Sequence, residues 1–571
     1  MTKQELQDLI SKSKRFGCDY HGTLDSGKFI PPDGTIVITG APIEEEDRIR
    51  EEIKALGYLD KVELIYNETD DISDIAVGKF KAKKIKELGI DLFFDNDPAQ
   101  IYWIKKFNPQ ANVVYINALN YAIFTYDFEC LGYALRLLEE GNSVVIGRLE
   151  PEDMGEKVGD PELEKRRKQI GSGLIKVVPA KTLFKFLMSN NEIEDYFVDF
   201  DFNYGYKYAE ELEKKGYVGL FPHEIDREME KDRQLAQDFV KKNYPDLFIP
   251  EEKEFKDISE AIDYIQESEK LYVIKPNSDK IYTFVPTSEE PDKFIEEAKS
   301  FLEENKKELE KEGFIVQEKI IQPVEATPEA IYYKGEPIAF TVDLELKKFG
   351  AGDISYQTGC TYDTVFPIDE DCRLVKVGLQ PYFETAKERK FSNFMDASML
   401  IDRKNDKPYF GEFCAARRGY NSFYTELTLL PSVSHFFECV KQGLNPFKAK
   451  LHPFENDVAK FAVSIRIFNL VEDKDRYPQS DLPIQVDKLL SKYIWLEDAK
   501  KVDNKIVTAG YKQDVAIVTG AGNSLKEAIE NAIMNVSGLV IRDMYFRNDL
   551  DSEEWYSLSN RYTYLLEQKW L

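Results

Sequence analysis

The stretch over residues 394–420 most tightly constrains how this chain can fold. It reads as two strands joined by a polar turn over 402–407, the first ending near Ile401 and the second running from Pro408 to about Cys414. Apolar and polar side chains alternate along both strands, which is typical of a sheet with one buried face. The sequence therefore predicts a β-hairpin whose polar side chains share a defined face.

Two carboxylates stand out in this hairpin. The alternation places Asp396 and Glu412 on neighbouring strands, facing the same side. Paired carboxylates in this arrangement are what a hard cation such as Mg²⁺ requires. Arg417 and Arg418 follow the second strand, and guanidinium groups suit phosphate oxygens. The alternative is a surface hairpin whose charges are solvated.

Charge and length limit the classes of protein that remain. The chain has 571 residues, which predicts roughly three to five domains at about 150 residues per domain. Its net charge is −28, so no overall field would attract phosphate backbones or anionic lipids. We therefore expect no nonspecific binding to nucleic acid and no binding to anionic membranes, although a local basic pocket remains compatible with this composition.

Cysteine spacing and hydropathy predict a cytoplasmic protein. The six cysteines are scattered without a CxxC pair, which favours free thiols in a reducing compartment. The first fifteen residues are polar, and no apolar run approaches the roughly 20 residues of a membrane span. We expect neither a signal peptide nor a transmembrane helix.

The first 118 residues alternate between strand and helix patterns. Such alternation predicts a parallel α/β sheet, in which ligands gather at the carboxyl ends of the strands. Polar side chains stand where the predicted strands end: Asp19, Thr39, Asp95 and Asp97. The sequence therefore predicts a binding site at that edge.

This order resembles the haloacid dehalogenase-type phosphatase superfamily over roughly residues 14–118. The resemblance implies that Asp19 is the nucleophile and that Thr39 supplies the phosphate-binding hydroxyl. It implies that Lys79 or Lys81 is the family's lysine, and that Asp95 and Asp97 are its metal-binding acids. The family usually carries a second Asp that protonates the leaving group, and His21 stands there in this chain. Because general acid catalysis is typically worth about 10²–10⁴-fold, this departure implies a slow phosphatase or a relic.

Residues 223–450 carry a second set of charged positions. Lys275 ends an apolar strand, Lys280 follows after a polar turn, and a later strand ends in the residues 317–319. This series resembles the ATP-grasp superfamily, in which two α+β lobes hold a nucleotide between them. The resemblance implies that Lys275 and Lys280 contact the phosphates and that Glu325 contacts the ribose. It implies adenine contacts from Gln317, Glu318 and Lys319. It also implies that Asp396 and Glu412 bind Mg²⁺ or Mn²⁺.

Two departures from the ATP-grasp pattern are plain. Cys414 stands where the family commonly has an Asn ligand, and a thiol is a poor partner for Mg²⁺. The loop around Lys280 also lacks the usual glycines.

Within that superfamily, residues 119–571 resemble phosphoribosylamine–glycine ligases. The resemblance implies substrate contacts from Asp353, Thr358 and Arg418, and places Arg417 on the transferred phosphoryl group, with Arg418 as its substitute. It implies ATP and Mg²⁺ (or Mn²⁺) as cofactors, and small-molecule substrates: an amino acid and a phosphorylated sugar amine or nucleotide. An acid would become an acyl phosphate, which an amine converts to an amide.

We therefore expect an α/β multidomain chain of four units. They are a haloacid dehalogenase-like parallel sheet (1–118), a pre-ATP-grasp α/β domain (119–222), a two-lobed ATP-grasp α+β fold (223–450) and a small C-terminal α+β domain (451–571). The expected function is a ligase, most simply of glycine with phosphoribosylamine, fused to a phosphatase-like domain. Two alternatives remain: a catalytically drifted binding or scaffolding protein, and a ligase for another acid and amine, such as a modified nucleotide.

Overall fold

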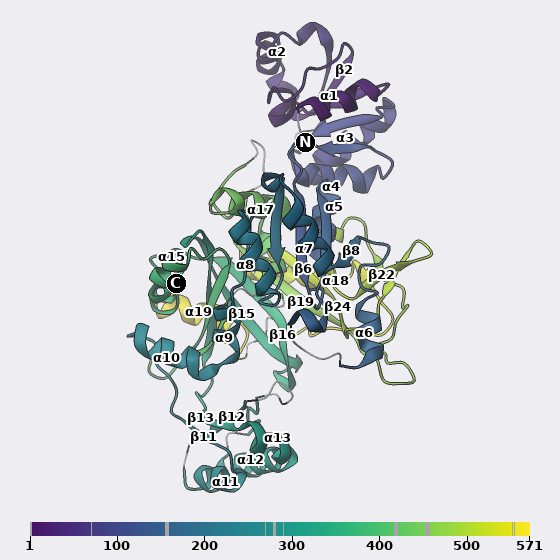
Figure 1. Cartoon of the computed structure of the whole chain (residues 1–571). Coiled ribbons are helices and arrows are strands. Elements are labelled where there is room, and N and C mark those ends of the chain that lie inside the picture. Colours follow the sequence, from purple (N-terminus) through teal and green to yellow (C-terminus); the bar gives the residue numbers. More distant parts are fainter. Residues whose placement is uncertain are drawn as a thin grey trace.

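A computed structural model describes most of the chain. The described residues are 3–69, 71–154, 159–268, 270–277, 281, 283–288, 290–415, 421–451, 457–550, 552, 554 and 556–571. Figure 1 shows the N-terminal domain at the top and a small lobe with α11–α13 at the opposite end. No helix in the described ranges is long and apolar enough to cross a membrane.

The N-terminal domain is a parallel sheet in the order β3-β2-β1-β4-β5. Its strands and helices are β1 (Phe16–Cys18), β2 (Thr35–Pro42), β3 (Val62–Asn67), β4 (Leu92–Asp95), β5 (Val113–Tyr115), α1 (Lys3–Lys12), α2 (Glu46–Ala55), α3 (Asp74–Glu87) and α4 (Pro98–Phe107). Short apolar strands buried on both faces are typical of parallel sheets covered by helices. Two separate apolar clusters fill this domain, so it has its own cores.

A second parallel sheet follows in the order β10-β9-β6-β7-β8. Its elements are β6 (Asn120–Thr125), β7 (Ser143–Arg148), β8 (Lys176–Pro179), β9 (Tyr196–Phe200), β10 (Val218–Leu220), α5 (Leu131–Glu139), α6 (Pro161–Arg167), α7 (Ala180–Ser189) and α8 (Tyr206–Lys215). Helices α9 (Glu224–Lys231) and α10 (Arg233–Asn243) then lead to the small lobe.

The small lobe is a three-stranded antiparallel sheet in the order β11-β13-β12. Its elements are β11 (Glu252–Phe255), β12 (Tyr272–Pro276), β13 (Phe314–Glu318), α11 (Ile258–Gln266), α12 (Pro291–Glu304) and α13 (Lys306–Glu312). The helices pack on the sheet through an apolar cluster that contains only residues of this lobe. A separate core lets the lobe behave as a unit.

A nine-stranded sheet forms the centre of the molecule, in the order β18-β17-β14-β15-β16-β19-β24-β21 with β26 beside β19. Its strands are β14 (Val324–Tyr333), β15 (Glu336–Gly350), β16 (Ile354–Pro367), β17 (Phe394–Asp402), β18 (Lys407–Ala415), β19 (Phe461–Asn469), β21 (Ile494–Leu496), β24 (Asp514–Gly522) and β26 (Met544–Tyr545). The pairing of β16 with β19 joins the C-terminal strands to this sheet across residue 450.

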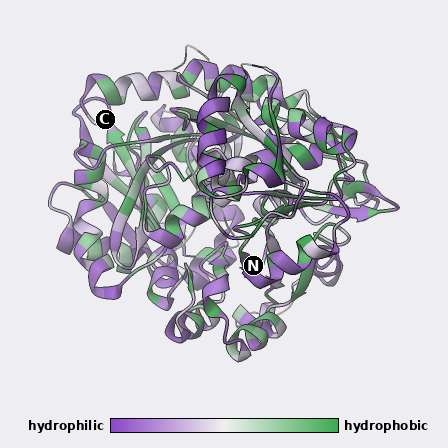
Figure 2. Ribbon diagram, turned by 90° about the horizontal axis from the view of Figure 1, so that it is seen from above, coloured by the Kyte–Doolittle hydropathy of each residue, from purple (hydrophilic) through white to green (hydrophobic). Residues whose placement is uncertain are grey.

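Helices cover the large sheet, and smaller strand pairs flank it. The helices are α14 (Arg373–Gly378), α15 (Phe383–Arg389), α16 (Ser422–Leu429), α17 (Val433–Gln442), α18 (Leu525–Val536) and α19 (Leu558–Glu567), and the paired strands are β20 (Gln485–Val486) with β25 (Leu539–Val540) and β22 (Ala499–Val502) with β23 (Lys505–Thr508). In Figure 2 the outer helices are largely purple and much of the green lies on the strands inside. One apolar cluster runs from Tyr121 to Trp570, so the second sheet and the large sheet share a core.

The C-terminus is anchored by Trp570, which is fully buried. Its indole Nε1–H donates to Asp406 Oδ1 at 2.6 Å, and the Arg373 guanidinium lies 3.6 Å from the ring centroid. Its carbonyl accepts from the Leu374 N–H at 3.1 Å. A single side chain therefore fastens the end of the chain to α14 and to the β17–β18 turn.

The second sheet and the large sheet, which share one core, are called the large body here. We expect Trp570→Ala to lower its free energy of unfolding by about 3–5 kcal/mol, because removing a buried aromatic ring leaves a cavity. Urea midpoints followed by circular dichroism measure this change. Leu566→Ala is the matched control, since Leu566 lies in α19 but is 48% exposed. Equal midpoints for the two variants would contradict this account.

Candidate functional site

One face of the large sheet carries a row of charged side chains. In β15, Thr341, Asp343, Glu345 and Lys347 are two residues apart and therefore share a face. The strand register brings other polar positions to the same face: Glu325 and Glu329 of β14, Asp363 of β16, Asp396 of β17 and Glu412 of β18. We call these residues the charged face.

Carboxylates dominate the charged face, and most of them are buried. Burial and the neighbouring Asp343 raise the pKa of Glu345 to about 8. Burial raises the pKa of Asp363 to about 7. The pKa of Glu329 also lies well above its usual range, because it is buried beside Glu426 and Asp396. Negative charge at this face is therefore costly until a cation compensates it.

Lys347 supplies a positive charge within this row. Its Nζ lies 2.7 Å from Glu325 Oε1 and 3.3 Å from Glu345 Oε2. Burial opposes ionisation of Glu325, but the Lys347 ammonium outweighs it and lowers the pKa of that carboxyl. Ser398 also donates to Glu325 Oε1, at 3.2 Å. Glu325 is thus held ionised by Lys347 in this structure.

Asp396 and Glu412 lie on the charged face as the sequence predicted. Asp396 is directly opposite Cys414, and Glu412 is two residues from Cys414 on the same side of β18. The Cys414 backbone N–H donates to Asp396 Oδ1 at 3.0 Å, so Cys414 orients the carboxylate through its main chain. Asp396 is buried, whereas the Glu412 side chain is 54% exposed.

This pair fits a divalent cation by its chemistry. Burial raises the pKa of Asp396, and Asp343, Glu345 and Glu412 add negative charge nearby. Mg²⁺ and Mn²⁺ prefer carboxylate oxygens, and either ion would offset that charge. Within the described ranges, no three His, Cys, Asp or Glu side chains are gathered closely enough to hold a metal ion. The metal-binding role of Asp396 and Glu412 therefore stays a prediction.

Lys275 of the small lobe interacts electrostatically with two residues of the charged face, Glu412 and Lys347. It lies at the end of β12, opposite Ile315 of β13. Burial and the nearby Arg233 lower the pKa of Lys275 to about 8, and Glu412 and Lys347 also act on it electrostatically. Lys275 and Lys347 thus both lie near Glu412, and Arg233 lies near Lys275. Such a group is suited to a polyanion.

A cleft of about 1460 Å³ separates the small lobe from the rest of the molecule. Arg233 and Glu252, which both influence Lys275, line it. Its other walls come from the second sheet and the start of β24, with Asp127, Glu129 and Lys512 among the lining residues. The cleft therefore offers a volume large enough for a nucleotide and a second substrate, and its described lining contains no residue of the charged face.

The predicted adenine contacts lie on β13 and just after it. Gln317 is buried and donates to Glu252 Oε2 at 2.9 Å. Glu318 forms an ion pair with Lys270 at 3.0 Å. The backbone N–H groups of Glu318 and Lys319 donate to the carbonyls of Glu251 and Leu271, so these donors are engaged within the lobe.

The predicted substrate contacts are Asp353, in the β15–β16 turn, and Thr358, within β16. Asp353 Oδ1 is 3.4 Å from an Arg547 NH group, and Thr358 donates to the Lys347 carbonyl at 2.9 Å. Arg547 is buried and also binds Asp549 at 2.7 Å. The remaining predicted residues, Lys280, Arg417 and Arg418, lie outside the described residues.

The N-terminal domain gathers its own charged cluster at the carboxyl ends of β1 and β4. Lys81 of α3 is fully buried, with its Nζ 3.1 Å from Asp19 Oδ1 and 2.8 Å from Asp95 Oδ2. Burial raises the pKa of Asp95 to about 6, and it also raises that of Asp19. The Lys81 ammonium contacts both carboxylates and so offsets part of their negative charge.

Other residues predicted for this cluster differ in their positions. Asp97 caps α4: its Oδ1 accepts from the Ala99 N–H at 2.9 Å, and its Oδ2 accepts from Gln100 Nε2 at 2.9 Å. Thr39 is buried, and its Oγ1 accepts from the Ala41 N–H at 3.1 Å. Lys79 instead lies 5.9 Å from the Phe107 ring centroid, so of the two candidate lysines only Lys81 reaches Asp19.

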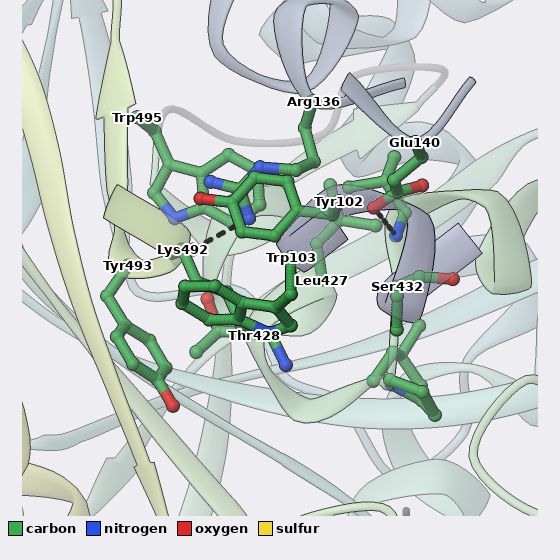
Figure 3. Close-up of a pocket in the computed structure, with 14 residues that line it drawn as sticks. Tyr102, Trp103, Arg136, Glu140, Leu427, Thr428, Ser432, Lys492, Tyr493 and Trp495 are labelled. Carbon is green, nitrogen blue, oxygen red and sulfur yellow. Dashed lines mark hydrogen bonds between the residues drawn. The ribbon is translucent and has the colours of Figure 1, made fainter. Parts of the chain in front are cut away.

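Arg136 links the N-terminal domain to the rest of the chain. Figure 3 shows its guanidinium between Tyr102 of α4 and Trp495 of β21, at 4.5 and 4.7 Å from the ring centroids. It donates to the carbonyls of Ser491 and Lys492 at 2.8 and 2.9 Å. The Tyr102 hydroxyl lies 2.6 Å from Ser491 Oγ. This contact fixes the N-terminal domain against the large body.

Sequence reasoning missed the charged residues of β15. The segment alternates Thr341, Asp343, Glu345 and Lys347 with Val342, Leu344 and Leu346, which is the same period-two signal as in the 394–414 hairpin. That alternation was sufficient to find them. Arg233 carries no such signal, because its proximity to Lys275 depends on how α10 packs.

No protein-family model matches the sequence, and no curated protein matches it. Solved structures do resemble it. Phosphoribosylamine–glycine ligase from Thermotoga maritima is similar at a TM-score of 0.53 and 16% identity, covering 76% of this chain and all of that chain. Phosphoribosylglycinamide synthetase from Anaerococcus prevotii is similar at a TM-score of 0.44 and 15% identity, covering 74% of this chain and 99% of that chain. Biotin carboxylase from Campylobacter jejuni is similar at a TM-score of 0.49 and 12% identity, covering 75% of this chain and 93% of that chain.

The Thermotoga similarity shows the fold. The chain shares the fold of that ligase, with a mixed α/β architecture of parallel sheets and one large antiparallel sheet. The predicted α/β multidomain architecture is thereby confirmed. The haloacid dehalogenase-like assignment of residues 1–118 stays a prediction.

We expect Lys275 to react with acetic anhydride at a lower pH than other lysines. With a pKa of about 8, roughly half of its amine is neutral and nucleophilic at pH 8. Mass spectrometry of protein labelled between pH 6 and 11 measures this profile. Lys293, exposed on α12 of the same lobe, is the internal reference. If both lysines gain reactivity over the same pH range, the pKa of Lys275 is not lowered.

Proposed function

We propose that residues 119–571 form an ATP-dependent carboxylate–amine ligase that uses Mg²⁺ or Mn²⁺. One observation carries this proposal: Glu412, on the same sheet face as Asp396, interacts electrostatically with Lys347 and with Lys275 of the small lobe. Lys275 in turn lies near Arg233, which lines the cleft. A face that joins metal-binding acids to phosphate-binding cations is suited to a nucleoside triphosphate. The ATP-grasp fold and the motif resemblance support the same reading.

The proposed reaction couples two steps. A carboxylate oxygen of the acid substrate attacks the γ-phosphorus of ATP, which gives an acyl phosphate and ADP. The amine nitrogen then attacks the acyl carbon, phosphate leaves, and the amine loses a proton to give the amide. Water would hydrolyse the acyl phosphate, so the small lobe must close over the cleft while this intermediate exists.

Each residue has a defined task in this scheme. Lys275 and Lys280 bind phosphates, Gln317 to Lys319 contact the adenine, and Glu325, held ionised by Lys347, accepts from the ribose hydroxyls. A divalent cation held by Asp396 and Glu412 would neutralise charge on the phosphoryl groups. Arg417, with Arg418 as its substitute, would stabilise the transferred group. Catalysis would then rest on positioning and charge neutralisation.

Glycine and phosphoribosylamine are the first pair of substrates to test. They are the substrates of the ligases that the motifs resemble, and Asp353 and Thr358, in the β15–β16 turn and in β16, belong to the segment that resembles the substrate segment. Another acid or amine, such as a modified nucleotide, is the second choice. The scaffolding alternative predicts ATP binding without turnover for every pair.

We expect Glu412→Gln to lower ADP formation with Mg²⁺-ATP, glycine and phosphoribosylamine by about 100-fold or more, because losing a metal ligand removes several kcal/mol of stabilisation. Mass detection of the amide product measures the loss. Glu290→Gln is the control, since the Glu290 side chain is 70% exposed and pairs with Lys293 at the surface of the small lobe. An unaffected rate in Glu412→Gln would refute the metal-binding role.

We also propose that the N-terminal domain is a phosphatase. The buried contact of Lys81 with Asp19 and Asp95 supports it. An Asp19 oxygen would attack the phosphorus of a phosphomonoester, the bond to the leaving oxygen would break, and that oxygen would take up a proton. Water would then hydrolyse the aspartyl phosphate, releasing inorganic phosphate and restoring Asp19.

His21 limits the protonation step. Burial and the nearby Arg48 lower the pKa of His21, and its Nε2 lies 3.2 Å from an Arg48 NH group. At pH 7 its imidazole is therefore neutral and a weak proton donor. The domain would thus act best on esters whose leaving oxygen needs little help from an acid.

We expect Asp19→Asn to abolish phosphate release and His21→Asp to increase it. The gain should reach about 10²-fold for alkyl phosphates, because a carboxylic acid restores general acid catalysis. p-Nitrophenyl phosphate is the reference substrate, and its gain should be smaller, since nitrophenolate leaves without protonation. Phosphate release by colorimetric assay measures both. Equal gains on the two substrates would exclude the acid role.

A further inference from the structure

A cleft of about 600 Å³ opens where the N-terminal sheet faces helix α17. The N-terminal domain contributes Gly22, Lys28, Asn96 and Asn117, and α17 contributes Glu438, Lys441 and Gln442. We call this space the interdomain cleft. It belongs neither to the charged face of the large sheet nor to the cleft beside the small lobe.

The floor of the interdomain cleft adjoins the Asp19–Lys81–Asp95 cluster. Asn96 directly follows Asp95 in the chain, and Thr23 donates to Asn96 Oδ1 at 3.0 Å. Gly22 has a φ of +68°, and a Cβ there would lie 2.3 Å from Asn96 Nδ2, so no other residue fits at this turn. The turn after Asp19 is thus pressed against Asn96. Gly22 and Asn96, which line the cleft, thus belong to the segments that directly follow Asp19 and Asp95.

The opposite wall is a rigid part of the ATP-grasp body. Glu140 fixes the first turn of α17, because its carboxylate accepts from the Val433 and Ser434 N–H groups at 3.0 and 2.8 Å. Arg136, packed between Tyr102 and Trp495, holds the N-terminal domain against the same body (Figure 3). The two walls of the cleft are therefore fixed relative to each other.

The chemistry of the walls points to an anionic, hydroxyl-rich occupant. Lys28 and Lys441 supply positive charge, and Asn96, Asn117 and Gln442 supply amide donors and acceptors. Glu438 is engaged by the Tyr115 hydroxyl, and Lys441 Nζ donates to the Glu194 carbonyl at 2.7 Å. Burial lowers the pKa of Lys441, so an anion beside it would stabilise its charged form.

We propose that the interdomain cleft binds the leaving group of a phosphomonoester cleaved at Asp19, and that Lys441 and Gln442 of α17 determine its specificity. The substrate class is a phosphorylated polyhydroxy compound with a second anionic group, as in a sugar bisphosphate. This inference rests on the phosphatase activity proposed above. The ATP-grasp body thereby selects what the N-terminal domain hydrolyses, which gives the fusion of the two a chemical reason.

The test compares two substrates in the full-length chain: glucose 1,6-bisphosphate, which carries the second anionic group, and p-nitrophenyl phosphate, which lacks it. We expect Lys441→Glu to lower the ratio of their kcat/KM values by about tenfold or more, as for the loss of a hydrogen bond to a charged group. Lys441→Ala should lower it less. Lys448→Glu is the matched control, because Lys448 is an exposed lysine that does not line the cleft. An unchanged ratio in Lys441→Glu overturns the inference.

A binding measurement separates this inference from the phosphatase proposal. We expect glucose 1,6-bisphosphate to bind the full-length protein in isothermal titration calorimetry, with at least about tenfold weaker binding to Lys441→Glu and unchanged binding to Lys448→Glu. If this pattern holds but phosphate release is absent, the phosphatase proposal fails and the cleft remains a binding site. If the bisphosphate binds all three proteins equally or binds none of them, the cleft assignment is wrong.

Discussion

The ion pair between Lys347 and Glu325 supplies the positive charge on the charged face of the large sheet. Burying an ammonium group is costly unless carboxylates surround it, and Lys347 meets this condition with Glu325 at 2.7 Å and Glu345 at 3.3 Å. Its single charge cannot balance every carboxylate on the charged face. Those left over have raised pKa values, as for Glu345 and Asp363. Ionising all of these buried carboxylates therefore costs free energy, and a bound cation would lower that cost.

The small lobe presents the opposite charge across the cleft. Lys275 has a lowered pKa because it is buried near Arg233, while the acids it faces have raised ones. Both pKa shifts have the same causes: burial comes first, and a neighbouring group of like charge adds to it on each side. A metal-bound polyanion would satisfy both, since its cation meets the acids and its phosphates meet the lysine. The separate core of the small lobe allows the two sides to approach or part.

The N-terminal domain follows the same principle on a smaller scale. Lys81 is buried between Asp19 and Asp95, and burial keeps the pKa of both carboxyls above the usual value. Asp97, which the motif places with these acids, is occupied in capping α4. The position of the domain is set by Arg136, whose contacts with Tyr102 and Trp495 join α4, α5 and β21. With the domain in this position, α17 lies across the interdomain cleft from the N-terminal site.

The sequence by itself determined the local elements. Period-two alternation predicted the hairpin that the structure forms as β17 and β18, with Asp396 and Glu412 on one face, because side-chain direction in a strand depends only on spacing. Alternating strands and helices likewise predicted the parallel N-terminal sheet, and with it the meeting of Asp19 and Asp95.

Tertiary structure decided what depends on contacts between distant segments. Lys81 rather than Lys79 reaches Asp19 because of how α3 rotates against the sheet, which local pattern does not fix. Pairing of β16 with β19 merged the C-terminal strands into the large sheet, and packing of α10 brought Arg233 to Lys275. The interdomain cleft exists only where α17 meets the N-terminal domain. Spacing along the chain carries no information about such meetings, because they are set by long-range packing.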